Sequence, residues 1–373
     1  MKPHEKVFLS LVRNSLWDTQ AEVPVDFKDW SLVMRLAKAQ AMEGAAAKAL
    51  LDSPDVLSRL KPGARDRLNN MLMTNVVMHS MAHSSIRVLV AALNNAGIDC
   101  VLLKGEGLAA DYAYPDIREC GDIDLYVGVE NYRRSYEVLK DVVDEIDAPS
   151  VLNGSGKHYH ALLSGISVEI HKYSEVMNSA SLDRIYQRYA ADGLSRNLAE
   201  IESGGIKVKI PEDSFNAFYV FSHLWNHFLT IGVGLRQVSD LTVLLHARAA
   251  YLDKDYLHQV LTEMKMMTPW KTFGCIAVDI LGLPEDEFPF YEPGFRNNAI
   301  KVFERILTEG DLGRETEFMR IPDRGFLYEK FFSLRWYLKR FLSLVRLFPH
   351  QSFCQLWHSV SNGLRRLFRK GKN

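Results

Sequence analysis

Two aspartates separated by one residue, Asp122 and Asp124, are the residues best placed to do chemistry. They lie in the segment GDIDLYV, whose alternation of polar and apolar residues predicts a β-strand. Side chains alternate along a strand, so both carboxylates project from one face while the residues between them point into a core. Adjacent carboxylates on an apolar strand repel each other, and desolvation strengthens the repulsion. A divalent cation would relieve it, and hard oxygen ligands suit Mg²⁺, with Mn²⁺ as an alternative.

A second alternating segment, ISVEIHKY, places Glu169 and His171 on one face of a strand. If this strand lies beside GDIDLYV, Glu169 becomes a third carboxylate near the aspartates. Three carboxylates can hold two metal ions about 3.5–4 Å apart, an arrangement that serves in-line phosphoryl or nucleotidyl transfer. Glu169 could also help to remove the proton of the attacking hydroxyl. His171 is interpreted either as an orienting residue beside the acid or as a direct catalytic group.

A glycine-rich turn precedes the aspartates. The apolar run IDCVLL predicts a strand that leads into Lys104-Gly105-Glu106-Gly107. Glycines let the backbone approach a phosphate closely, and free N–H groups in such a turn can point at it. Lys104 and Arg118 are candidate charge partners for a triphosphate. The alternatives are an ordinary lysine at a strand end and an arginine that pairs with Asp116 or Glu119.

In this order the motifs resemble a bacterial family of largely uncharacterised nucleotidyltransferases in the DNA polymerase β-type superfamily. The resemblance covers about residues 95–245. The matching segments are VLLKGEGL at 101–108, Tyr114-Pro115-Asp116 with Arg118, GDIDLYV at 121–127, Glu169-Ile170-His171, His223-Leu224-Trp225-Asn226-His227 and GLRQVSDL at 234–241. The superfamily usually has Gly-Gly or Gly-Ser at the turn, where this chain has Gly105-Glu106, and Asp is commoner than Glu at the third acid.

The resemblance implies Mg²⁺-dependent transfer of a nucleoside monophosphate from an NTP such as ATP to an acceptor hydroxyl, with release of pyrophosphate. Asp122, Asp124 and Glu169 would bind the metals, and the turn at 104–107 would bind the nucleotide together with Arg118. The acceptor would be a small molecule, a protein or RNA. This function requires that Glu169 face the two aspartates and that no lysine fill the position of the ions. The alternatives are an RNA-directed enzyme of toxin or defence type and a non-catalytic nucleotide-binding scaffold.

Two further pairs of residues lie four apart in segments with helical spacing, so each pair shares a helix face. His223 and His227 could suggest zinc, but neither an HExxH glutamate nor an obvious third ligand accompanies them. We interpret them as lining the substrate cleft or as hydrogen-bonded core histidines. Arg236 and Asp240 are predicted to form an ion pair within the helix, or a buried pair that presents Arg236 to the substrate or fixes the helix against the nucleotide domain.

The helices and strands expected around these residues correspond to an α+β, helix-rich fold. Apolar residues recur at helical spacing before residue 90, and a long helix is expected from about Ala64 to Ala96, with Gly97 as its C-cap. We divide the chain into a helical N-terminal region (1–90), a minimal nucleotidyltransferase α/β core with a small mixed sheet (91–180), a helical domain lining the cleft (181–290) and a helical basic C-terminal region (291–373).

The composition is that of an ordinary globular protein, with 47% hydrophobic residues, 24% charged residues and a net charge of −1. It excludes a disordered or collagen-like chain and argues against nucleic-acid binding driven by overall charge. Four cysteines without a CxxC motif argue against a disulfide scaffold. The first residues lack the apolar core of a signal peptide, and no run of 18 apolar residues occurs, so we expect a cytoplasmic protein without a spanning segment.

The balanced charge hides a basic C-terminus. Residues 330–373 contain ten Lys or Arg and no Asp or Glu, so the rest of the chain is acidic. Apolar residues in this region form one helical stripe, made of Phe331, Leu334, Leu338, Phe341, Val345 and Phe348. We favour a helix packed on the acidic body, and the alternatives are contact with an anionic membrane surface or with RNA.

Overall fold

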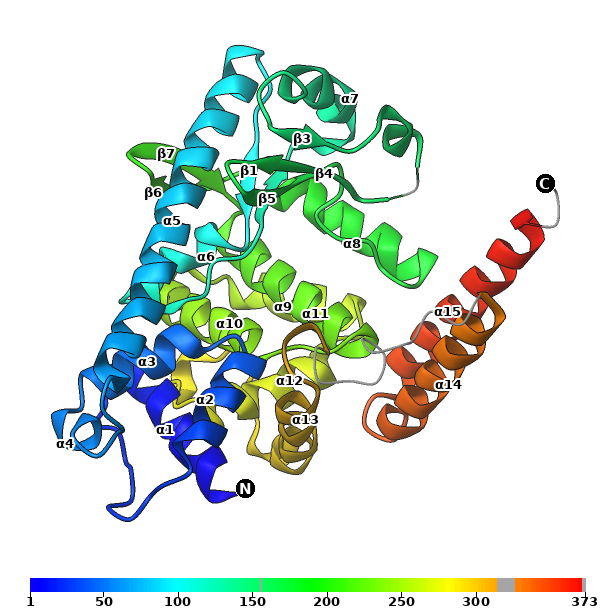
Figure 1. The fold of residues 1–373 in the computed structure, drawn as a ribbon. Helices are drawn as coiled ribbons and strands as arrows, with labels where there is room; N and C mark the ends of the chain where they lie inside the picture. The colour runs from blue at the N-terminus through cyan, green and yellow to red at the C-terminus, as the bar shows by residue number, and fades with distance from the viewer. Residues whose placement is uncertain (155, 314–325, 371–373) are drawn as a thin grey trace.

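The protein has a five-stranded mixed sheet with a two-stranded sheet beside it, and helices lie on both sides of the larger sheet (Figure 1). The computed structural model describes residues 1–154, 156–313 and 326–370. The larger sheet has the order β1-β2-β5-β4-β3. Its strands are β1 (Val101–Leu103), β2 (Ile123–Tyr126), β3 (Glu145–Ile146), β4 (His158–Leu163) and β5 (Ile166–His171), and the smaller sheet consists of β6 (Ala199–Ser203) and β7 (Ile206–Ile210). The expectation of a helix-rich α+β fold with a small mixed sheet is confirmed.

The pairing of β2 with β5 sets the geometry of the candidate site. The two strands run parallel, and Asp124 lies opposite Glu169 in the register. β1 lies antiparallel on the other side of β2, with Leu103 opposite Asp124. The acids therefore share one face of the sheet, because side chains at paired positions of neighbouring strands point the same way. The alternate residues of these strands point into the core on the opposite face.

Helices α5 (Ala64–Asn95) and α7 (Gly128–Leu139) cover that apolar face. The long helix ends where the sequence predicted, and Gly97 after it has a φ of +68°. Among the described residues, α5 is the one helix long and apolar enough to cross a membrane by length and composition. Its side chains Ala82, Ile86 and Leu89 are fully buried in the core beneath the sheet, which accounts for its apolar face.

The other face of the sheet looks toward a helical body. This body contains a second hydrophobic core, to which the N-terminal helices also contribute. Its helices are α1 (Pro3–Trp17), α2 (Trp30–Ala39), α3 (Glu43–Leu51), α4 (Pro54–Leu57), α8 (Ala180–Gly193), α9 (Asp213–Thr230), α10 (Leu235–Arg248), α11 (Lys254–Glu263), α12 (Met267–Cys275) and α13 (Arg296–Glu309). The acid-bearing face of the sheet is therefore opposed by helices, with α9 and α10 nearest the acids.

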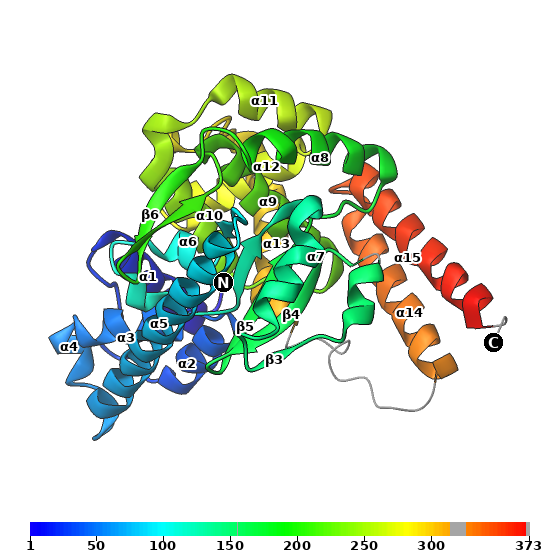
Figure 2. The ribbon, with the colours of Figure 1, turned by 90° about the horizontal axis from the view of Figure 1, so that it is seen from above.

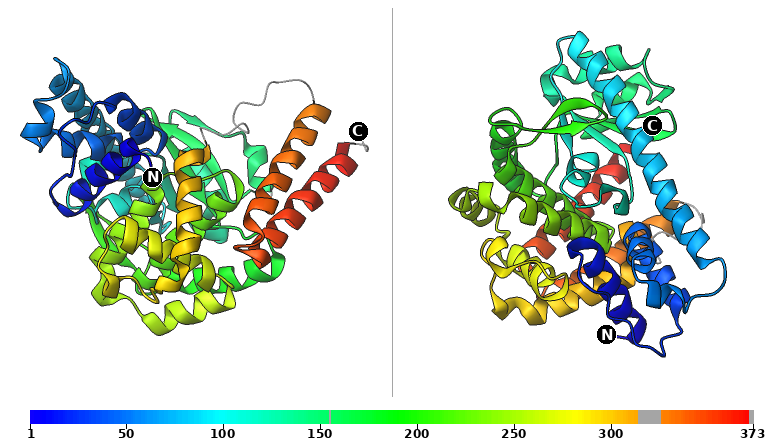
Figure 3. Two further views of the ribbon diagram at one scale, coloured as in Figure 1. Left: turned by 90° about the horizontal axis from the view of Figure 1, so that it is seen from below. Right: turned by 90° about the vertical axis from the view of Figure 1, so that its left-hand side faces the viewer.

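The C-terminal helices α14 (Phe326–Leu344) and α15 (Pro349–Lys370) form a hairpin that extends away from the body (Figures 1 and 2). It lies on the side opposite the N-terminal helices (Figure 3). The base of the hairpin packs on α9, where the ring of Phe348 lies 4.8 Å from that of Trp225. Arg340 is buried there and contacts Glu309 at 2.9 Å.

The predicted packing of the apolar stripe on the acidic body is only partly correct. Phe348 is buried, but Phe331 is 68% exposed, and Leu334 and Leu338 are also exposed. The hairpin leaves the body after its base, so the first half of the stripe has no neighbour within the described part of the chain that buries it. An ion pair between Arg340 and Glu309 anchors the base instead.

Candidate active site

Three carboxylates from two strands meet at one point of the larger sheet. Asp122 immediately precedes β2, Asp124 lies within it, and Glu169 lies on β5. One carboxylate oxygen from each residue lies within 4.8 Å of those from the other two. Glu169 thus faces the aspartates, as the sequence-based prediction required. Such a set of hard oxygen donors fits a divalent cation.

The electrostatics of the three acids also favour a cation. The negative charge of Asp124, together with burial, raises the pKa of Asp122. Burial opposes ionisation of Asp124, but Lys104 and His171 outweigh it and hold the pKa of that carboxyl well below its usual range. The Oδ2 atom of Asp124 is buried and has no hydrogen-bond partner among the described residues. A buried carboxylate oxygen without a partner is costly, and a metal ion would provide one.

Lys104 lies close to the position proposed for the ions. Its Nζ atom is 2.8 Å from Oδ1 of Asp124. Burial lowers the pKa of Lys104, but the three carboxylates outweigh it and raise that pKa above its usual range, so the side chain is an ammonium. The requirement that no lysine fill the ion position is therefore met only in part. Lys104 and the raised-pKa imidazole of His171 oppose three carboxylates, and Oδ2 of Asp124 is left without a partner among the described residues. Even with both groups protonated, the three carboxylates exceed them by one negative charge.

The turn after β1 directs Lys104 toward this cluster. Gly105 has a φ of +50°, a conformation that favours glycine, and a Cβ atom there would lie 3.0 Å from the carbonyl oxygen of Asp122. The glycine is thus needed for the close approach of the turn to β2. Glu106 begins the short helix α6 (Glu106–Ala109) and faces away from the acids, where it pairs with two histidines of α5.

His171 holds two of the acids in place. Its Nε2 atom lies 2.9 Å from Asp124 Oδ1 and 3.2 Å from Glu169 Oε2, while Nδ1 lies 3.2 Å from the carbonyl oxygen of Tyr173. Burial opposes protonation of His171, but the hydrogen bonds to Asp124 and Glu169 outweigh it and raise its pKa. With acceptors at both nitrogens, the ring donates twice. This geometry favours the interpretation of His171 as an orienting residue.

A cavity of about 330 Å³ opens beside the acids, toward α9 and α10. Most of the residues selected from the sequence line it. They are Lys104, Gly105, Arg118, Asp122, Asp124, Glu169, His223, His227, Arg236 and Asp240. Glu106 and Gly107 do not line it, because Glu106 faces α5 and Gly107 lies against Leu102 and Ile210. The prediction of His171 as a substrate-cleft residue is also wrong, because its side chain is fully buried and does not line the cavity.

Arg118 and Asp240 form a buried pair that the sequence analysis did not foresee. The Nε and Nη2 atoms of Arg118 donate to the two oxygens of Asp240 at 2.8 and 3.0 Å, and the hydroxyl of Tyr112 donates to Oδ1 at 2.8 Å. The proposed pairing of Arg118 with the side chain of Asp116 or Glu119 is wrong. So is the predicted ion pair between Arg236 and Asp240, because Asp240 already has these two donors.

Arg236 is turned toward the cavity instead. Its guanidinium lies 3.6 Å from Asp311, and its Nε atom is buried without a hydrogen-bond partner among the described residues. The side chain lines the cavity that holds the acids. This agrees with the alternative that the helix presents Arg236 to a substrate.

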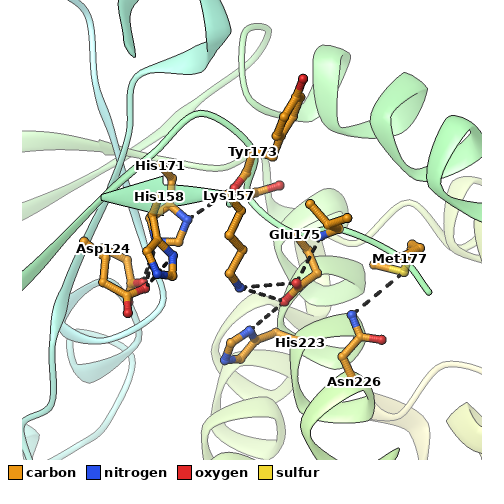
Figure 4. Close-up of polar contacts among 12 residues, drawn as sticks. Asp124, Lys157, His158, His171, Tyr173, Glu175, Met177, His223 and Asn226 are labelled. Atoms are coloured by element: carbon orange, nitrogen blue, oxygen red, sulfur yellow. Dashed lines mark hydrogen bonds and ion pairs between the residues drawn. The ribbon is translucent and has the colours of Figure 1, made fainter. Parts of the chain in front are cut away.

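Lys157 and Glu175 belong to the site but carry no motif that sequence reasoning could recognise (Figure 4). Lys157 Nζ lies 3.2 Å from Glu175 Oε1, and His223 Nδ1 lies 2.9 Å from Glu175 Oε2. Burial opposes ionisation of Glu175, but Lys157 and His223 lower its pKa. Lys157 lines the cavity and points toward the side where His223 and His227 lie. His223 and His227 both line the cavity, as their interpretation as cleft residues requires.

Acid should destabilise the protein through His227. Burial lowers the pKa of His227 to about 4, whereas an unfolded histidine titrates near 6.5. The unfolded state therefore binds more protons between these two pH values. The folding stability that depends on a neutral His227 is fully present above pH 6.5 and is lost as the pH falls toward 4. For His227 alone we expect a loss of about 2 kcal/mol between pH 7.5 and 5.

Urea denaturation of the wild type and of His227→Gln at both pH values measures this effect. His79 and His171, whose pKa values are raised, act in the opposite direction. The test therefore uses the difference between the wild type and the variant in how the unfolding free energy changes with pH. An equal pH dependence in wild type and variant would contradict the assignment of His227.

Comparison with known proteins identifies one family. A family model described as an uncharacterised nucleotidyltransferase matches residues 26–282, which is more than half of the chain. The match includes the larger sheet, α9 and α10, and thus all three acids and the helices that face them. No curated protein and no solved structure matches the chain.

Proposed function

Because the chain belongs to a family of uncharacterised nucleotidyltransferases, we propose that it transfers a nucleoside monophosphate from an NTP to an acceptor hydroxyl and releases pyrophosphate. The observation that carries this proposal is the convergence of Asp122, Asp124 and Glu169 at the cavity, with one oxygen of Asp124 buried and without a partner. Family membership supports the class of reaction, and the donor set supports its dependence on Mg²⁺.

The three acids would hold Mg²⁺ in this proposal. When bound, the metal neutralises charge on the triphosphate and lowers the pKa of the attacking hydroxyl. The protein itself supplies orientation: His171 fixes the carboxylates of Asp124 and Glu169 through its two short contacts. Glu169 is the residue that we propose to take up the proton of the acceptor hydroxyl.

Four cations line the cavity, and three of them would contact the triphosphate in this proposal: Lys104, Lys157 and Arg236. Lys157 is held by Glu175, and Arg236 keeps a buried N–H without a partner. Arg236 is thus the side chain best prepared for an anionic ligand. Arg118 has a different role in this proposal, because its guanidinium is engaged by Asp240 and connects the loop before β2 to α10.

Label transfer tests the proposal directly. The full chain is incubated with each labelled NTP, Mg²⁺ and a cell extract, and the products are separated into protein, RNA and small molecules. We expect one class of acceptor to become labelled by the wild type and not by the double variant Asp122→Ala, Asp124→Ala. Label transfer that persists in this variant would exclude the mechanism.

An RNA acceptor is the second candidate, and the C-terminal hairpin favours it. Residues 330–373 contain ten cations and no acid, and Trp357 on α15 is 75% exposed. Exposed aromatic and basic side chains together are typical of surfaces that bind single-stranded nucleic acid. The base of the hairpin covers Trp225, so removal of the whole hairpin would expose the core.

A chain that ends at residue 362 keeps this base and loses five cations. If RNA is the acceptor, we expect the truncated chain to label RNA at least about tenfold less at physiological salt, because phosphate contacts dominate such binding. Its circular dichroism should not change. Unaltered RNA labelling would show that the last residues of the hairpin do not bind the RNA acceptor.

A further inference from the structure

A second group of metal-ligand side chains lies behind the turn at 104–107, on the side away from the three acids. His79 and His83 are four residues apart on α5 and both face Glu106 at the start of α6. His79 Nδ1 lies 2.8 Å, and His83 Nε2 lies 3.0 Å, from the same oxygen of Glu106, Oε2. Ligand atoms of His79, Glu106 and Cys120 all lie within 4.8 Å of one another.

The carboxylate of Glu106 is the unusual feature of this cluster. The residue is 3% exposed, and its second oxygen, Oε1, is buried without a hydrogen-bond partner among the described residues. Burial opposes ionisation, but His79 and His83 outweigh it and hold the pKa of Glu106 well below its usual range. The thiol of Cys120, a weak donor, lies beside this carboxylate and interacts with it. A cation would satisfy the buried anion better than a thiol does.

His79 has the hydrogen-bonding pattern of a metal ligand. Its Nε2 atom lies 2.9 Å from the carbonyl oxygen of Arg118, so that nitrogen carries the proton and donates it. Without a metal ion, Nδ1 carries a second proton and donates it to Glu106, and this hydrogen bond helps to raise the pKa of His79. A bound metal ion would displace that proton to solvent and take its place as the partner of Nδ1. Histidines that bind metals typically donate their other N–H to a backbone carbonyl in this way.

The cluster is also accessible from solvent. A pocket of about 290 Å³ opens beside it and is lined by His79, Ser80, His83, Ser84 and Arg87 among others. The side chain of His83 is 37% exposed at its mouth. This pocket shares no lining residue with the cavity of the candidate active site. An ion could enter here without passing the three acids.

We propose that His79, His83, Glu106 and Cys120 form a zinc site. An imidazole, a carboxylate and a thiol lie within 4.8 Å of one another, and His83 brings a second imidazole to the same carboxylate. These are the ligand types that Zn²⁺ prefers, and four protein ligands make a closed structural site. A thiolate and two imidazoles do not suit Mg²⁺, which prefers oxygen ligands. Cys120 gives up its thiol proton to solvent when the metal binds. The zinc ion would join α5 to the turn that positions Lys104. It would thereby hold the ammonium group of Lys104 beside the three acids.

Metal content and cobalt spectroscopy of the full chain test the proposal. After growth with added zinc and dialysis, we expect about one zinc per chain by mass spectrometry. Replacement by Co²⁺ should give the intense near-ultraviolet absorption of a thiolate–cobalt bond. Both signals should be lost in Cys120→Ser, and zinc content should fall at least about tenfold in His83→Gln.

Matched controls separate this site from the three acids. Asp122→Asn should keep the zinc and the thiolate–cobalt absorption, and circular dichroism shows whether Cys120→Ser and His83→Gln remain folded. Little zinc in the wild type would overturn the proposal and leave a hydrogen-bonded ion pair. Zinc that is unchanged in both ligand variants, or lost in Asp122→Asn, would overturn it as well. None of these measurements depends on nucleotidyl transfer, so this inference stands or fails separately from the proposed function.

Discussion

Asp122→Asn is expected to abolish nucleotidyl transfer and, at the same time, to stabilise the fold. The variant loses a charged ligand of the proposed metal site, for which we expect activity to fall about 1,000-fold or more, roughly 4 kcal/mol of barrier. Its effect on stability has the opposite sign. The charge of Asp124 and burial raise the pKa of Asp122, so the ionised side chain is disfavoured in the folded state. A neutral amide of the same size removes that penalty.

The two effects are measured on one protein sample. Label transfer gives the activity, and the melting temperature without and with Mg²⁺ gives the stability. We expect the variant to melt above the wild type without Mg²⁺ and to lose most of the increase that Mg²⁺ causes. The control is Asp141→Asn, which changes an exposed acid outside the cavity and should change neither quantity. A variant that is both inactive and less stable would indicate general damage and contradict this account of the site.

Arg118→Met is expected to destabilise the protein by about 3–5 kcal/mol. Arg118 is 5% exposed, and its guanidinium makes two contacts of 2.8 and 3.0 Å with Asp240. Without it, the carboxylate of Asp240 remains buried with the hydroxyl of Tyr112 as its donor. The cost comes from this unpaired charge more than from the lost contacts, because both groups have already left water in the folded state.

A double-mutant cycle separates the charge from the packing. Asn at position 240 keeps a hydrogen bond with Tyr112 but carries no charge, so Arg118→Met combined with Asp240→Asn should cost less than Arg118→Met alone. Arg196→Met is the matched control, since the side chain of Arg196 is 77% exposed and its loss should cost less than about 0.5 kcal/mol. If the loss of unfolding free energy in the double variant equals the sum of the losses in the two single variants, Arg118 and Asp240 are not coupled. The unpaired charge of Asp240 would then not be the cause of the destabilisation.

The exposed half of the C-terminal stripe shows that apolar periodicity predicts a helix face but not its burial. The spacing of Phe331, Leu334 and Leu338 predicts one apolar face, and α14 is indeed a helix. Periodicity does not say whether such a face is covered, because burial depends on where the hairpin leaves the body. Only Phe348, at its base, meets the aromatic side chain of Trp225. Phe341 and Val345 are partly buried, and Phe331, Leu334 and Leu338 are exposed.

The sequence by itself determined which residues share a face of a strand. Alternation along GDIDLYV and ISVEIHKY is local, and it predicted that Asp122, Asp124 and Glu169 would face one way once β2 and β5 paired. The sequence also predicted that Gly105 allows a close approach of the backbone, but to a phosphate. In the structure the close neighbour of Gly105 is the backbone of Asp122.

Only the tertiary structure decided which opposite charges meet. Asp240 pairs with Arg118, 122 residues away, rather than with Arg236 one helical turn before it, and Glu106 turns from the predicted phosphate site to His79 and His83. Lys157 and Glu175 join the site without any motif. The physical reason is that a buried charge must find whichever partner the packed helices bring within about 3 Å. That choice depends on contacts across the chain, which local spacing does not encode.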